Sequence, residues 1–123
     1  MHLHGFIADT TQAAIDTFYA PYASVMTQLG RERGWPAMTR GQFDRLRAPD
    51  GALAVGDPHA VTEKLLSVID LLGLDRLLLH LSVGTMPHAD VLRAIELLGT
   101  VVAPAVRTEL ARRSAAPERA PAA

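Results

Sequence analysis

The sequence predicts an α/β fold in which parallel strands alternate with helices. Residues 52–55 read as a short buried strand, residues 58–72 as an amphipathic helix, and residues 77–83 as a nearly continuous apolar strand. Apolar runs without alternation are typical of parallel strands that are covered on both faces. A strand–helix–strand crossover is parallel and right-handed in nearly all known cases. We therefore expect residues 52–55 and 77–83 to pair as adjacent parallel strands.

Two helices are expected before these strands, after a short opening segment. Asp9 and Gln12 form a capping-box-like pair, which places the start of the first helix near Thr10. Pro21 lacks a backbone donor and clashes with the preceding turn, so it predicts a kink in this helix. Gly34 predicts the end of the helix, because glycine weakens helices and commonly follows them.

Capping residues also mark the next two helices. Thr39 and Gln42 form a capping box, which predicts a short helix that continues through Leu46. Asp57 can cap the helix that follows the first predicted strand, and Pro58 suits its first position because an amide hydrogen there would have no partner. The local sequence therefore predicts where both helices begin.

The predicted order of elements is helix, helix, strand, helix, strand, helix. Gly73 predicts the end of the helix that joins the two strands, and Pro87 predicts the start of a last helix that reaches Val102. Two parallel strands cannot cover their own edges. We therefore expect either further strands or a partner chain beside them.

The composition excludes several classes of protein. The 123 residues suit one domain, and 49% hydrophobic with 20% charged residues is enough apolar material for a core. A formal net charge of -1 offers no basic surface for nucleic acid or an anionic membrane. The absence of cysteine excludes disulfides, thiolate zinc sites and a cysteine nucleophile. Residues 1–5 lack the pattern of a signal peptide, and the apolar runs are too short to span a bilayer, so a cytoplasmic location is expected.

Several segments resemble the C-terminal end of luciferase-like flavin-dependent monooxygenases. The resemblance covers residues 3–113, about the last third of a full-length relative. It implies a partial TIM-type (β/α)8 barrel, made of the last two β/α units preceded by two helices, with a disordered tail at 114–123. The matching segments are 4–10 (HGFIADT), 31–36 (RERGWP), Gly56-Asp57-Pro58 with Val61, Lys64 and Leu65, 82–88 (SVGTMPH) and 91–104 (VLRAIELLGTVVAP).

The resemblance also implies a cofactor and a reaction. Members of this family bind FMN or its deazaflavin analogue at the C-terminal mouth of the barrel, and they oxidise small organic substrates with oxygen or transfer hydride. A complete barrel needs roughly 250 residues, and most flavin contacts come from strands that this sequence does not contain. We therefore expect the chain alone to be inactive and to bind no flavin, with the other barrel half or a homo-oligomer as its partner. The rival hypothesis is a non-catalytic interaction protein.

Three residues are predicted at the rim of the flavin site. By the resemblance, Gly56, Ser82 and Gly84 would border the cofactor, because they follow barrel strands. The simpler interpretation is that Gly56-Asp57 only starts a helix and that Gly84 only permits a tight turn. Asp57 argues against a phosphate at that helix start.

Histidines supply the remaining candidates. His4 and His80 are predicted to line the substrate side, although His80 could instead face a covering helix. His2 and His4 share one strand face and could bind a metal, as in a hydrolase fragment, but no matching third ligand is visible. No nucleophile and base are recognisable as a pair, so we predict neither a catalytic residue nor a metal site.

Overall fold

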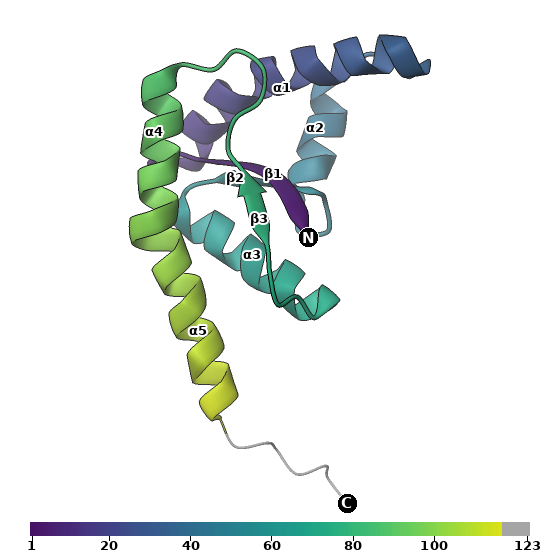
Figure 1. The fold of residues 1–123 in the computed structure, drawn as a ribbon. Coiled ribbons are helices and arrows are strands. Elements are labelled where there is room, and N and C mark those ends of the chain that lie inside the picture. Colours follow the sequence, from purple (N-terminus) through teal and green to yellow (C-terminus); the bar gives the residue numbers. More distant parts are fainter. Residues whose placement is uncertain (117–123) are drawn as a thin grey trace, which may run out of the picture.

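The computed structural model describes residues 1–116 and shows one small parallel sheet surrounded by helices (Figure 1). Ser114 and Ala115 end the last helix, whereas residues 117–123 of the predicted tail lie outside the described residues. No helix within the described part is long and apolar enough to cross a membrane. The elements are β1 (His2–Ile7), α1 (Thr11–Arg33), α2 (Arg40–Arg47), β2 (Leu53–Gly56), α3 (Pro58–Leu72), β3 (Leu78–His80), α4 (His88–Leu97), the π-helical turn η1 (Leu98–Val102) and α5 (Ala103–Ala115).

The sheet has the strand order β2-β1-β3, and both pairings are parallel. The prediction of parallel strands is confirmed, but the prediction that the segments around β2 and β3 are adjacent is wrong. The opening segment forms a strand between them, with His4 opposite Leu53 on one side and opposite His80 on the other. Leu3, Phe6 and Ile7 of β1 are fully buried, so the central place in the sheet gives β1 both its hydrogen-bond partners and its apolar cover.

Strand β3 is shorter and more exposed than its sequence predicts. Only Leu78–His80 pairs with β1, whereas the expected strand spanned residues 77–83. Leu78 is 56% exposed, because β3 is an edge strand and its outer part is not covered. Leu81 and Val83 are buried, but they lie in the loop that follows. The expected cover on both faces is therefore wrong for this strand.

Helix α1 is continuous from Thr11 to Arg33, with Pro21 inside it. Its cap is Thr10, whose hydroxyl oxygen accepts a hydrogen bond from the amide of Ala13 at 3.1 Å, and not Asp9 as the sequence predicts. Asp9 instead pairs with Arg93 of α4 at 2.7 Å. Both residue types can cap a helix, and in this structure Thr10 takes the cap while Asp9 forms the ion pair.

The predicted starts of α2 and α3 are confirmed. Thr39 and Gln42 form the reciprocal capping box of α2. The Asp57 carboxylate accepts a hydrogen bond from the Ala60 amide at 2.8 Å, and Pro58 occupies the first position of α3. Gly73 ends α3 with φ of 60°, the left-handed region in which glycine carries no steric cost.

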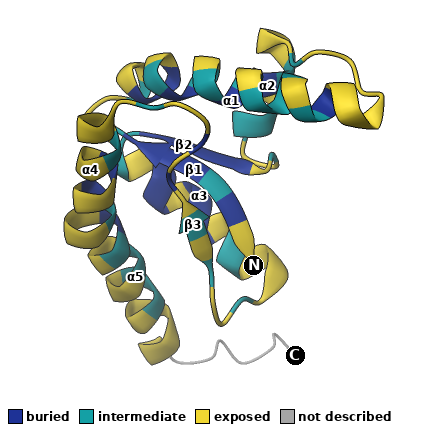
Figure 2. Ribbon diagram, turned by 45° about the horizontal axis from the view of Figure 1, so that its top comes forward, coloured by how far each residue is buried: buried dark blue, intermediate teal, exposed yellow. Residues whose placement is uncertain are grey.

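Helices cover both faces of the sheet (Figures 1 and 2). On one face, aromatic side chains of α1 and α2 pack on β1, with ring centroids 6.0 Å apart for Phe6 and Phe18 and 6.3 Å for Phe18 and Phe43. On the other face lie α3 and the helical column α4–η1–α5. Gly5 lies on this second face, where a Cβ atom would meet the Ala54 carbonyl oxygen at 2.5 Å, so the close packing there requires glycine.

Candidate functional site

Three histidines gather on one face of the sheet, beside its outer strand β3. Alternation along β1 places His2 and His4 on the same face, and the parallel register places His80 of β3 directly beside His4. The ring centroids are 5.6 Å apart for His2 and His4, 5.3 Å for His2 and His80, and 5.0 Å for His4 and His80. We call these three residues the histidine cluster.

The surroundings of His4 differ from those of its two neighbours. His2 and His80 are exposed, whereas His4 is half-buried and its Nδ1 has no hydrogen-bond partner within residues 1–116. Burial lowers the pKa of His4, and the positive charges of His80 and His2 lower it further. The His4 imidazole is therefore neutral at pH 7, and one of its ring nitrogens can accept a proton or a hydrogen bond.

A tyrosine completes the wall behind the cluster. The Tyr22 ring of α1 lies 6.2 Å from the His4 ring, measured between centroids. Burial raises the pKa of Tyr22, so its phenol stays protonated at neutral pH. A neutral imidazole beside aromatic surface suits a small organic molecule with one polar group. The residues described, 1–116, contain no group of three or more His, Cys, Asp or Glu that could hold a metal ion.

The three residues predicted at the flavin rim do not lie together. Gly56 ends β2, and a Cβ atom there would lie 3.4 Å from the Thr11 hydroxyl at the start of α1. Gly84 lies against the middle of the same helix, where a Cβ atom would meet Val25 at 2.9 Å. Since an α-helix rises 1.5 Å per residue, Thr11 and Val25 are separated by about 20 Å. Ser82 belongs to the Gly84 loop, so this structure separates Gly56 from the other two.

The start of α3 is occupied by contacts within the chain. The Asp57 amide donates to the Thr11 hydroxyl oxygen at 3.1 Å, and the Asp57 carboxylate accepts from the Ala60 amide. These contacts leave Asp57 in the capping role of the simpler interpretation. His4 and His80, by contrast, are the two predicted substrate-side residues that the structure does bring together.

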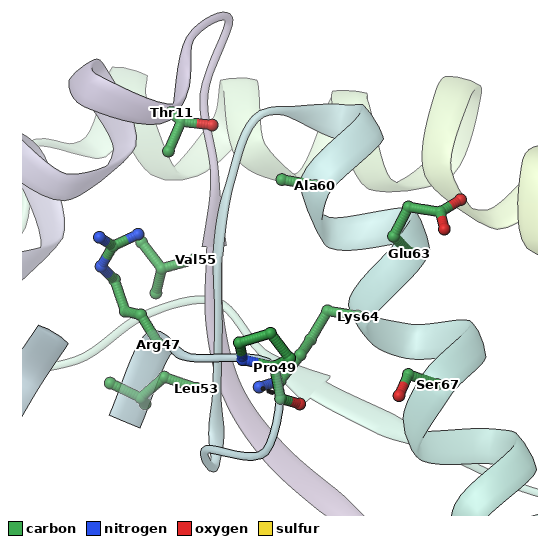
Figure 3. A pocket seen from close by; sticks show the side chains of 9 residues that line it. All are labelled: Thr11, Arg47, Pro49, Leu53, Val55, Ala60, Glu63, Lys64 and Ser67. Atoms are coloured by element: carbon green, nitrogen blue, oxygen red, sulfur yellow. Dashed lines mark hydrogen bonds between the residues drawn. The ribbon is translucent and has the colours of Figure 1, made fainter. Parts of the chain in front are cut away.

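Sequence reasoning missed a second site, a cavity of about 360 Å³ at the outer edge of β2 (Figure 3). Two cationic side chains line it, Arg47 from α2 and Lys64 from α3. Lys64 could have been noticed, because its position falls on the apolar face of α3 together with Val61 and Val68. No comparable pattern in the sequence distinguishes Arg47 from the other arginines of α2.

No protein-family model matches this chain, and no curated protein matches it.

Proposed function

We propose that this chain supplies β/α units of a luciferase-like flavin-dependent oxidoreductase, with FMN or its deazaflavin analogue held mainly by strands outside it. One observation carries the proposal: three parallel strands are linked by helices, so that the carboxyl ends of the strands point to the same edge of the sheet. In β/α barrels that edge carries the active site. In this proposal the chain alone is not a catalyst.

The histidine cluster offers a surface for substrate binding, with His80 at the carboxyl end of β3 and with His2 and His4 in the first half of β1. The His4 and His80 rings are stacked at 5.0 Å, on a face where Tyr22 contributes aromatic surface. A small organic substrate could place a polar group on the neutral His4 and apolar surface against the rings. In this role His4 and His80 bind and orient the substrate, and the oxidation chemistry is supplied by the flavin when it is bound.

The strand order sets a condition on this proposal. Each strand of a β/α barrel pairs with the next strand in sequence, whereas β1 here lies between β2 and β3. Assembly of a barrel therefore requires β3 to leave β1 and to pair with the free edge of β2. Strand β3 contributes only Leu78–His80 to the sheet, so few hydrogen bonds oppose this exchange.

Flavin titration tests the proposal. The isolated chain, titrated with FMN and followed by quenching of flavin fluorescence, should show no saturable binding at micromolar concentration and should not consume oxygen with reduced flavin. A pocket for a cofactor of this size needs most of the ligand surface enclosed. Mixing with a chain that carries the preceding strands of a luciferase-like oxidoreductase should restore binding. Saturable binding by the isolated chain, or no binding by the mixture, would contradict the proposal.

A second candidate function, a non-catalytic interaction domain, is favoured by the exposed edges of the sheet. Within residues 1–116, neither β2 nor β3 has a strand on its outer side. Leu78 of β3 and Ile95 of α4 border the same shallow surface, and both are about half exposed. Unpaired edges and apolar surface favour association with another chain. A stable complex in the mixture that binds no flavin would select this second function.

A further inference from the structure

The cavity at the outer edge of β2 has the size and shape of a small-molecule site. Its volume of about 360 Å³ falls within the usual range for ligand pockets. Pro49, Leu53, Val55 and Ala60 form apolar walls around it (Figure 3). None of the predicted flavin or substrate residues lines this cavity, so it is separate from the histidine cluster.

Arg47 brings hydrogen-bond donors into the cavity without an adequate acceptor. Its Nε atom is buried and has no hydrogen-bond partner within residues 1–116. Its ion pair with Asp44 is long, at 3.8 Å, and its guanidinium carbon lies 5.8 Å from the centre of the Phe43 ring. Buried polar atoms in folded proteins nearly always have partners. A guanidinium in this state is suited to a planar acceptor that takes two parallel hydrogen bonds, such as a carboxylate.

Lys64 adds a second positive charge from the opposite helix. Its ammonium group donates to the carbonyl oxygens of Ala48 and Pro49, which fixes the turn after α2 and leaves one of its three donors. Burial lowers the pKa of Lys64, because the charged form loses hydration there. The exposed Asp50 opposes this shift only in part. An anion in the cavity would stabilise the charged ammonium.

Asp44 and Asp50 lie outside the cavity lining, and no carboxylate among the lining residues pairs with either cation. The Thr11 hydroxyl oxygen accepts from the Asp57 amide, so its hydrogen remains available as a further donor. Glu63 is exposed at the rim, and Figure 3 shows its carboxylate directed away from Arg47. We propose that the cavity binds one small organic monoanion, a carboxylate on an apolar body, with Arg47 as the main carboxylate donor and Lys64 as the second charge.

This inference does not rest on the proposed function. The ligand occupies the free edge of β2, which is the edge that β3 would have to fill in a barrel. A bound carboxylate would therefore favour the strand order of this structure over the barrel order. Binding of the carboxylate is measured on the isolated chain without flavin, so it can fail or succeed independently of the flavin titration.

Amide NMR of the ¹⁵N-labelled full chain, titrated with sodium benzoate, tests the proposal. Amide signals of residues 47, 48, 50, 51 and 60–67 should shift in a saturable manner with one site. Benzamide has the same ring without the charge, and it should bind at least about tenfold more weakly, since hydrogen bonds to charged groups are the stronger ones. Inorganic phosphate, which lacks the apolar body, should also bind more weakly than benzoate.

Two arginine variants supply a matched comparison. Arg47→Met removes the donors but keeps an apolar stem, and it should weaken benzoate binding at least about tenfold. Arg45→Met changes an exposed arginine of the same helix outside the cavity, and it should bind benzoate as the unmodified chain does. Melting temperatures check that both variants fold. The proposal would be overturned if benzoate gave no saturable shifts, or if benzamide or phosphate bound as tightly as benzoate. It would also be overturned if the two variants had equal effects. The comparison with benzamide uses the unmodified chain, so it does not depend on whether a variant folds.

Discussion

His4 occupies a position in the central strand at which an apolar side chain would be expected. Leu3, Phe6 and Ile7 in the same strand are buried and apolar, and the His4 Nδ1 atom is buried without a partner in the described chain. Burial and the nearby His80 and His2 lower the pKa of His4 from its ordinary value of 6.5. At pH values between the lowered pKa of the folded chain and the ordinary pKa of the unfolded chain, the unfolded chain therefore binds more protons at His4 than the folded chain does.

We expect the free energy of unfolding to fall as the pH is lowered from about 8, through the ordinary histidine pKa, to about 5. Stability from a depressed histidine pKa is present above the unfolded value and is lost as the pH falls through the folded value. His4→Gln should flatten this dependence, measured by urea unfolding with circular dichroism. His88→Gln, at the exposed start of α4, is the control. Equal slopes for the two variants would show that His4 does not carry the effect.

Single residues were predicted well from sequence where the interaction is local. The Thr39–Gln42 capping box and the Asp57 cap each join residues three positions apart, so the sequence alone identifies them. The partner of Asp9 could not be predicted in the same way. Arg93 lies far along the chain, and only the packing of α4 beside the start of α1 brings the two side chains together.

At the scale of elements, two neighbouring leucines of strand β3 face opposite sides of the sheet, and only one of them is covered. Leu79 faces the same side as Leu3 and is half-buried, whereas Leu78 is 56% exposed. Leu79→Asp should lower the free energy of unfolding by about 1–3 kcal/mol, the range for placing an unpaired polar group against apolar surface. Leu78→Asp should change it by less than about 0.5 kcal/mol. Urea unfolding of both variants measures the difference, and the reverse order would show that the strand faces the other way.

The errors in the predicted strands have a common physical origin. The segment of β1 was predicted only as an opening segment with a strand face at His2 and His4, because His4 and Gly5 interrupt its apolar pattern, so its length and its central place in the sheet were missed. Strand β3 was predicted too long, because Leu81 and Val83 are apolar and buried but belong to a loop. Burial alone does not distinguish a paired strand from a loop that packs on the core.

At the scale of the whole molecule, the order of strands decides which side chains meet. His4 and His80 are in contact only because β3 lies beside β1. No local sequence pattern specifies whether β3 pairs with the free edge of β1 or with the free edge of β2. The histidine cluster and the cavity at the edge of β2 both follow from this choice, which is why neither site was predicted as it stands.

Cysteine pairs test the strand order, and the chain contains no natural cysteine to interfere. His2→Cys with Leu78→Cys joins residues that are direct neighbours in the β1–β3 register, so a disulfide should form under mild oxidation. Leu53 and His80 lie on opposite sides of His4, two strand spacings or roughly 10 Å apart. The pair Leu53→Cys with His80→Cys should therefore stay reduced. Thiol counting by mass spectrometry after alkylation measures both.

The cysteine pairs also report on assembly. For this test the reduced chain is mixed with the complementary chain before oxidation. If the strand exchange required for a barrel occurs, the first pair should then stay reduced, because β3 lies beside β2 and no longer beside β1. A first pair that never oxidises in the isolated chain, together with a second pair that does, would contradict the strand order described above.

The central place of β1 has a consequence for how the chain acquires its structure during synthesis. Position 4 pairs with positions 53 and 80, so the strand that leaves the ribosome before the other two has no partner until residues 53–56 have been made, and its second partner follows only with residues 78–80. Before residues 53–56 are made, the apolar side chains of Leu3, Phe6 and Ile7 have no sheet to join. Pairings between residues so distant in sequence form slowly and expose intermediates to aggregation. Nascent chains of this protein should therefore depend on chaperones more than helical proteins of equal length do.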